Sequence, residues 1–199
     1  MSKKAIIATS TSCLDYLNLE EKDLRIIRMK ILMGEDTFED FIDITAEDFY
    51  NKIKADKNLV PSSSMPSIGE YLDTLEELEA SGYEEVLVLT ISSELSGTYG
   101  IVAAATDNNY EGNMKIKVLD TRNAAISEGF MTLEAFRLFK EGKSMDETYD
   151  YLEKLRINRK QFFMVDNLRL FVANGRLSGA SGFIGSMFKI KPILEVNEE

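Results

Sequence analysis

The spacing of apolar residues divides the chain into two kinds of segment. Short, mainly apolar runs over residues 4–8, 85–91, 115–119 and 161–165 predict β-strands. The run at 85–91 is apolar at successive positions, as expected for a parallel strand buried on both faces. The stretches between these runs place apolar residues three and four positions apart, which is typical of amphipathic helices.

Capping signals mark where these helices begin and end. Ser67 with Glu70, and Ser144 with Glu147, have the spacing of a capping box, and the first helix stops at Gly82. A third helix runs from about residue 124 to 140 and ends at Gly142, while Thr45 opens another that runs towards residue 55.

This order of strands and helices predicts an α/β fold, in which helices cover both faces of a parallel sheet. Residues 24–33 interrupt the rhythm with alternating apolar and basic side chains, which favours a half-exposed strand near an edge, as part of a strand insertion. We assign residues 1–160 to this domain and residues 161–199 to the start of a second α/β domain, containing a helix and then a strand. A strand so close to the last residue leads us to expect a truncated second domain.

Composition excludes several classes of function. The chain contains no histidine, which removes the usual general base and the commonest metal ligand, and the single Cys13 excludes a cysteine-cluster metal site. A net charge of −11 without a basic cluster argues against nucleic acid as a partner. The N-terminal apolar run is too short for a signal sequence, and no stretch approaches the length of a membrane span. We therefore expect a cytoplasmic protein with no metal, no cofactor and no integral membrane contact.

Two hydroxyl-rich segments, residues 61–67 and 92–99, lie before predicted helix starts and are the candidate binding segments. Backbone N–H groups at a helix N-terminus attract anions, and short hydroxyls beside them can donate further hydrogen bonds. Taken alone, the first segment is more often a polar turn, and the second is either an anion cradle or a plain cap. Arg176 alone is more often a solvated charge than a ligand group.

Several ordered motifs resemble those of the DegV family of bacterial fatty-acid-binding proteins. Thr9-Ser10-Thr11 resembles its opening Asp-Ser-Thr, and residues 61–67 resemble its Pro-Thr-Thr-Ser-Gln-Pro-Ser loop. Residues 92–99 match its Ser-Ser-x-Leu-Ser-Gly-Thr-Tyr run, residues 175–178 resemble its Gly-Gly-Arg-Ile-Ser, and residues 190–194 match its Ile-Lys-Pro-Ile-Leu. The chain departs from the pattern at Thr9, Ser62, Ser63, Met65 and Asn174, and it lacks the family's C-terminal segment with its histidine.

The resemblance implies a two-domain protein that holds one long-chain fatty acid, with the acyl tail buried between the domains and the carboxylate near the hydroxyl segments. It also implies a kinase partner that carries ATP and phosphorylates the bound carboxylate. On this similarity Ser63 stands at a carboxylate-binding threonine and Ser96 at the second hydroxyl ligand, with Gly97 allowing close backbone approach. The candidate ligand-binding residues are Ser63, Ser64, Ser96, Gly97 and Arg176, and none is expected to be catalytic.

Two other classes of function remain open from the residues. A serine-dependent acyl hydrolase using Ser96 or Ser63 would need a lysine or carboxylate as its base, and no Gly-x-Ser-x-Gly elbow is present. A binding module for a small carboxylated or phosphorylated metabolite would use the same hydroxyl segments without an acyl tunnel.

Overall fold

The computed structural model describes residues 2–165, 168–176 and 191–196. Contacts between Cα atoms group these residues into two compact units. Unit 1 contains residues 2–29 and 65–159, and unit 2 contains residues 30–64, 160–165, 168–176 and 191–196. The prediction placed all of residues 1–160 in one domain, whereas the structure groups residues 30–64 with unit 2.

A four-stranded parallel sheet forms the centre of unit 1. Its strands are β1 (Lys4–Thr9), β2 (Leu24–Ile27), β6 (Glu85–Thr90) and β7 (Lys115–Asp120), in the order β2-β1-β6-β7. In the register of this sheet, Ile6 lies opposite Leu24 on one side and Leu87 on the other. The predicted strands at 4–8, 85–91 and 115–119 are confirmed, as is the predicted parallel α/β sheet.

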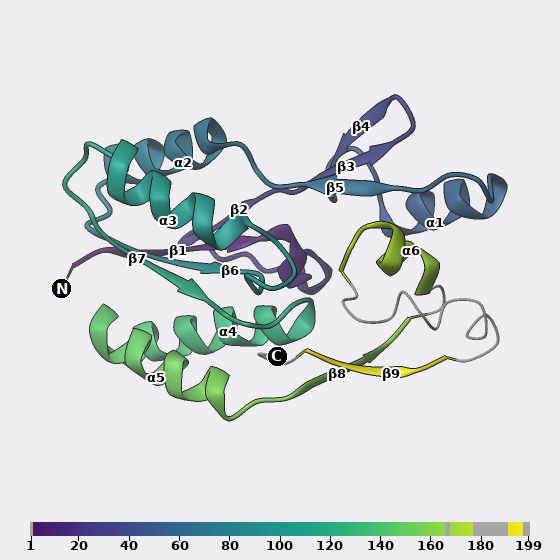
Figure 1. Ribbon diagram of the computed structural model, residues 1–199. Helices are drawn as coiled ribbons and strands as arrows, with labels where there is room; N and C mark the ends of the chain where they lie inside the picture. The colour runs from purple at the N-terminus through teal and green to yellow at the C-terminus, as the bar shows by residue number, and fades with distance from the viewer. Residues whose placement is uncertain (1, 166–167, 177–190, 197–199) are drawn as a thin grey trace. The chain divides into compact units, whose positions relative to one another are not determined.

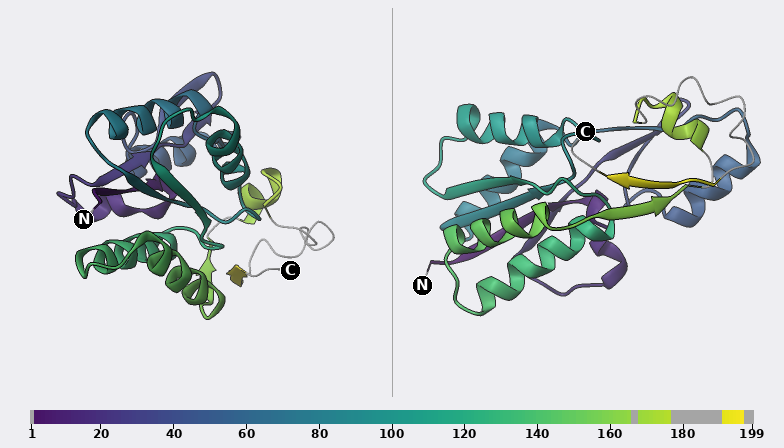
Figure 2. Two further views of the ribbon diagram at one scale, coloured as in Figure 1. Left: turned by 90° about the vertical axis from the view of Figure 1, so that its left-hand side faces the viewer. Right: turned by 60° about the horizontal axis from the view of Figure 1, so that its bottom comes forward.

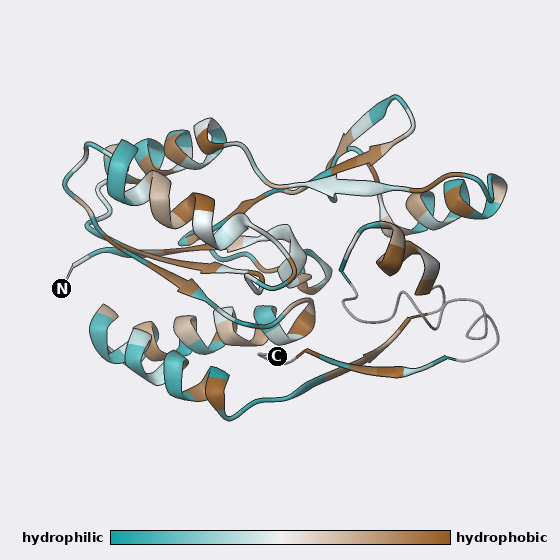
Figure 3. Ribbon diagram, in the orientation of Figure 1, coloured by the Kyte–Doolittle hydropathy of each residue, from teal (hydrophilic) through white to brown (hydrophobic). Residues whose placement is uncertain are grey.

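Four helices cover the two faces of this sheet (Figures 1 and 2). They are α2 (Ile68–Ala80), α3 (Thr98–Asn109), α4 (Ile126–Lys140) and α5 (Met145–Ile157). Side chains alternate across the strands, so Ile7 and Val88 pack with α2 and α3, while Ile6 and Leu87 pack with α4 and α5. The strands of this sheet are largely hydrophobic in Figure 3, which is consistent with their burial on both faces. Two short 3-10 helices, η1 (Ser10–Ser12) and η2 (Leu14–Leu17), follow β1.

The predicted caps are present. Ser67 Oγ accepts the N–H of Glu70 at 3.1 Å, and Glu70 Oε2 accepts the N–H of Ser67 at 3.0 Å, which completes a capping box. Ser144 and Glu147 make the same reciprocal pair at the start of α5. Gly82 and Gly142 follow the helix ends with φ values of +80° and +84°, a region that strongly favours glycine.

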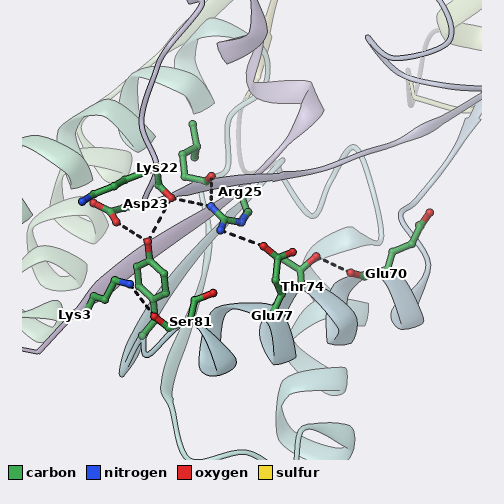
Figure 4. A network of polar contacts seen from close by, with 10 residues as sticks. Lys3, Lys22, Asp23, Arg25, Glu70, Thr74, Glu77 and Ser81 are labelled. Carbon is green, nitrogen blue, oxygen red and sulfur yellow. Dashed lines mark hydrogen bonds and ion pairs between the residues drawn. The ribbon is translucent and has the colours of Figure 1, made fainter.

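Polar contacts join α2 to the sheet (Figure 4). Arg25, on the edge strand β2, reaches Glu77 with a separation of 3.2 Å between Nη2 and Oε1. Lys3 Nζ donates to the carbonyl oxygen of Ser81 at 2.8 Å. Both pairs are exposed, so each contributes little to the stability of the fold.

Unit 2 is built from antiparallel pairs. The strands β3 (Lys30–Met33), β4 (Asp36–Glu39) and β5 (Ser62–Ser64) form one sheet in the order β4-β3-β5. A second pair consists of β8 (Gln161–Met164) and β9 (Ile193–Val196). The helices are α1 (Ala46–Ala55), capped by Thr45 as predicted, and α6 (Leu168–Ala173).

The structure corrects two local predictions. Residues 24–33 form two strands rather than one: β2 is a half-exposed edge strand of the parallel sheet, as predicted, whereas β3 pairs antiparallel with β4 and β5. The predicted loop at 61–67 contains the strand β5, which gains backbone hydrogen bonds by pairing with β3. Both errors concern which distant segment a strand pairs with, a choice that local patterns do not encode.

Candidate functional site

Hydroxyl groups gather at the carboxyl ends of the parallel strands in unit 1. From β1 the chain goes to β2 on one side, whereas β6 lies on the other side and leads to β7, so the strand order reverses between β1 and β6. Ligands of open parallel sheets bind at the carboxyl ends of the strands beside such a reversal. The segments that follow β1, β6 and β7 are therefore the candidate site.

The segment after β6 is a tight turn that carries Ser96 and Gly97 into α3. The carbonyl oxygen of Ser92 accepts the N–H groups of Leu95 and Ser96, both at 3.0 Å, and the N–H of Ser92 donates to Asn123 at 2.8 Å. Ser96 Oγ accepts the N–H of Thr98 at 3.3 Å and lies 2.8 Å from Thr98 Oγ1. One proton serves the contact between these two hydroxyls, so the second proton is not used in it.

The space around Gly97, rather than its backbone conformation, favours glycine at this position. Its φ of −72° is accessible to any residue. A Cβ at this position would lie 3.0 Å from the Sδ of Met65, closer than ordinary contact. Gly97 precedes the first turn of α3, where no side-chain cap is present and the first N–H groups carry the positive end of the helix dipole.

A buried carboxylate at the end of β7 holds this turn in place. Asp120 Oδ2 accepts the hydroxyl of Ser93 at 2.6 Å, and Oδ1 accepts the N–H groups of Ser93 at 3.3 Å and Arg122 at 2.8 Å. Arg156 Nη1 donates to the carbonyl oxygen of Asp120 at 2.8 Å. Ser93 therefore acts as an anchor of the turn.

A second buried acid lies behind the segment that follows β1. Glu128, in the first turn of α4, is 0% exposed, and its oxygens contact the hydroxyls of Thr9 at 2.5 Å and Thr11 at 2.8 Å. Burial raises the pKa of the Glu128 carboxyl group to about 8, although the threonine hydrogen bonds oppose this shift. Nearby, Ser12 Oγ is buried without a hydrogen-bond partner in the described structure.

Sequence reasoning did not identify Asp120 or Glu128. A signal for Glu128 was present, because it lies three residues before Met131 and seven before Ala135, on the face of α4 that is buried. An acid on the apolar stripe of a helix requires a buried polar partner.

Ser63 and Ser64 belong to unit 2, where they lie opposite Ile31 and Lys30 of β3. Both side chains are exposed. Successive residues of a strand point to opposite faces, so these two serines face opposite sides of β5. Their strand geometry does not direct both hydroxyls to one ligand atom.

Arg176 follows the end of α6, in unit 2. Gly175 has a φ of +71°, its N–H donates to Val172 at 3.0 Å, and the N–H of Arg176 donates to Phe171 at 3.0 Å, which together form a Schellman motif. The guanidinium donates to the carbonyl oxygen of Asn174. Asn174 Nδ2 in turn donates to the carbonyl oxygen of Pro61 at 3.1 Å, so the Arg176 turn is tied to the residue before β5.

Residues 177–178 of the Gly-Arg-Leu-Ser motif, and residue 190 of the Ile-Lys-Pro-Ile-Leu motif, lie outside the described residues. Within the described part of the chain, no three acids or cysteines come together in a way that could hold a metal ion. None of the helices described there is long and apolar enough to cross a membrane.

Comparison with known proteins identifies relatives of the chain. The sequence model of the DegV family, described as uncharacterised proteins, matches residues 3–199. A DegV domain-containing protein of Clostridium acetobutylicum is 33% identical over 199 residues, which are 100% of this chain and 69% of that protein.

Solved structures that are similar in fold include two proteins described as fatty-acid-binding. DegV from Bacillus subtilis, described as a fatty acid binding protein, superposes with a TM-score of 0.87 at 31% identity, covering 100% of this chain and 69% of that one. A fatty acid binding DegV family protein from Streptococcus agalactiae superposes with a TM-score of 0.88 at 27% identity, with the same coverage of both chains.

Proposed function

The chain belongs to the DegV family, and from that premise we propose that it binds a long-chain fatty acid, with the carboxylate held by hydroxyl and amide donors. The observation that carries the proposal is the turn at Ser96 and Gly97. It presents a hydroxyl proton and helix N–H groups at the carboxyl end of β6, in a fold whose solved relatives are described as fatty-acid-binding.

Neutral donors suit a carboxylate that leaves water. Each hydrogen bond to a charged group contributes on the order of 1.5–3 kcal/mol, which offsets the loss of hydration. Burying an acyl tail contributes about 0.8 kcal/mol for each methylene, before ordering costs are subtracted. Head-group donors therefore set orientation, and the tail supplies most of the affinity.

Ser63, Ser64 and Arg176 are part of the same proposal as ligand-binding residues. The side chains of all three residues are exposed. Ser63 and Ser64 face opposite sides of β5, so we expect Ser63→Ala and Ser64→Ala to differ in their effect on binding.

We further propose that the bound fatty acid is presented to an ATP-dependent kinase partner, in the cytoplasm, and that the chain itself is not an enzyme. Hydroxyl donors support this role because they leave a carboxylate oxygen with more nucleophilic character than a bidentate guanidinium would. Formation of an acyl-phosphate from bound oleate, only when both ATP and the kinase are added, would support it.

The measurement that tests binding is mass spectrometry of an organic extract of the purified protein, calibrated against protein concentration. We expect a near-stoichiometric fatty acid, and roughly tenfold weaker retention in Ser96→Ala, because one hydrogen bond to a charged group is lost. Ser81→Ala, at the exposed end of α2, serves as the matched control and should retain lipid as the unmodified chain does.

The alternatives predict different results. A well-folded protein whose extract is empty, and which takes up no added oleate, would overturn fatty acid binding and favour a small-anion module. Turnover of an acyl ester that disappears in Ser96→Ala would favour a hydrolase. Ser96 Oγ contacts the hydroxyl and N–H of Thr98, neither of which is a base, so we expect no such turnover.

A further inference from the structure

Three side chains at the carboxyl end of β1 form a closed ring of short contacts. Glu128 Oε1 lies 2.5 Å from Thr9 Oγ1, and Oε2 lies 2.8 Å from Thr11 Oγ1. The two threonine oxygens are themselves 2.6 Å apart. The ring joins the segment after β1 to the first turn of α4, across 119 residues of sequence.

The number of protons available to the three contacts of the ring depends on whether Glu128 is protonated. Each of the three oxygen–oxygen contacts is at hydrogen-bond distance and requires one proton between its two atoms. Each threonine hydroxyl donates one proton, so Thr9 and Thr11 supply two. An ionised Glu128 would accept both and leave the contact between the threonines with no proton. A protonated Glu128 supplies the third and closes the ring.

We propose that Glu128 is a positioning residue held as a neutral carboxylic acid, and that its proton fixes the residues that follow β1 at the sheet edge where a ligand carboxylate binds. This inference rests on the proposed function for its ligand, although the protonation state stands on the ring alone. A neutral Glu128 also avoids placing a second negative charge near the bound carboxylate at the carboxyl ends of the strands.

Among the residues that the structure describes, the charged groups around α4 do not supply a cation to Glu128. Asp15 and Arg28 pair with each other at 2.7 Å, Asp120 accepts from Ser93 and from the Arg122 N–H, and Arg159 donates to the carbonyl oxygen of Ser127 at 3.3 Å. The hydrogen bonds recorded for the Glu128 carboxyl group in the described structure go to threonine hydroxyls and to the Thr9 backbone. Burial therefore raises the pKa of the Glu128 carboxyl group to about 8, against the opposing effect of the threonine hydrogen bonds.

The direction of the pH effect follows from linkage. The pKa of Glu128 is raised in the folded protein above its ordinary value of 4.5, so the folded state retains a proton that the unfolded state loses. Stability from this group is fully present below about pH 4.5 and is lost as the pH rises through about 8. Ionisation in that upper range opens the ring, and the segment after β1 loses its anchor.

Carbon-13 NMR of glutamate carboxyl groups tests the protonation state directly, without any lipid. We expect one carboxyl signal to remain in the acid form at pH 6 to 7, where ordinary glutamates are ionised. That signal should be absent from Glu128→Gln. The inference is overturned if the signal missing from Glu128→Gln is one that titrates at an ordinary pH in the unmodified protein.

Oleate binding as a function of pH tests the positioning role. Affinity should fall by up to about tenfold for each pH unit above the Glu128 pKa, because binding then requires a proton to be restored. Glu128→Gln should show no such fall, since the amide donates and accepts in the ring without titrating. Glu141→Gln, an exposed acid at the other end of α4, should follow the unmodified protein.

Equal pH profiles for Glu128→Gln and the unmodified protein would overturn the positioning role, because the remaining pH dependence would belong to the ligand. Absence of oleate uptake at every pH would instead overturn the proposed function. The NMR result would still decide the protonation state of Glu128, so the two failures are distinguishable.

Discussion

At the scale of single residues, Gly97 shows how closely the candidate turn is packed. A side chain at Gly97 meets the Met65 Sδ at 3.0 Å, whereas nothing lies within 4 Å of a Cβ added at Gly100, one turn into α3. The two glycines therefore provide a matched pair, in which the same substitution has opposite expected signs.

We expect Gly97→Ala to lower the free energy of unfolding by about 1 kcal/mol, because the Met65 side chain must move. Gly100→Ala should raise it by about 0.5–1 kcal/mol, because alanine loses less backbone entropy in a helix. Urea denaturation measures both. Adding Met65→Ala should remove most of the Gly97→Ala penalty, and an unchanged penalty in the double mutant would contradict this contact as its cause.

At the scale of elements, two helices begin with the same pair of reciprocal hydrogen bonds, the capping boxes of α2 and α5. We expect Ser67→Ala in α2 and Ser144→Ala in α5 each to cost about 1 kcal/mol, because each leaves the N–H of the third helical residue without its partner. The two effects should add in the double mutant, since the caps share no contact. Thermal or urea unfolding measures this, and a combined loss far above the sum would show that α2 and α5 are coupled.

Elements specified by local signals were predictable from the sequence. The strands β1, β6 and β7 follow from short apolar runs, and the caps of α1, α2 and α5 follow from hydroxyl and acid spacing, because each depends on residues within a few positions. Local sequence predicts a loop at β5, because three successive serines have no strand propensity of their own. Its conformation comes from pairing with β3, about 30 residues away in sequence.

The residues of the candidate site also differ in whether local sequence could identify them. Ser96 and Gly97 were recognisable because their segment is contiguous and precedes a helix start. Glu128 and Asp120 were not, because their importance comes from burial against hydroxyl groups supplied by other strands and loops. A pattern within one helix marks where an acid is buried, but only the fold supplies its partners.

At the scale of the whole molecule, charge and chemistry at the site are connected. A chain with a net charge of −11 repels an anionic ligand at long range, so recognition of a carboxylate depends on local donors in the site. Ser96 and the start of α3 supply such donors. The neutral form of Glu128 that we propose would keep a further negative charge away from this sheet edge.

The two units differ in how much of their structure is buried, and this difference predicts their local stability. Every residue of β1 from Ala5 onward, and of β6 from Val86 onward, is buried, whereas β5 is exposed at all three positions and α1 contains no buried residue. Opening free energies rise with the number of buried apolar contacts that an element must break, and short antiparallel pairs are marginal by themselves. We therefore expect native-state hydrogen exchange to be slowest for the amides of β1 and β6, near the global free energy of unfolding. The amides of β5, α1 and the β8–β9 pair should exchange through local opening. Their opening free energies should depend much less on denaturant concentration. Equal protection in both units, with one common denaturant slope, would instead show that they unfold as a single cooperative body.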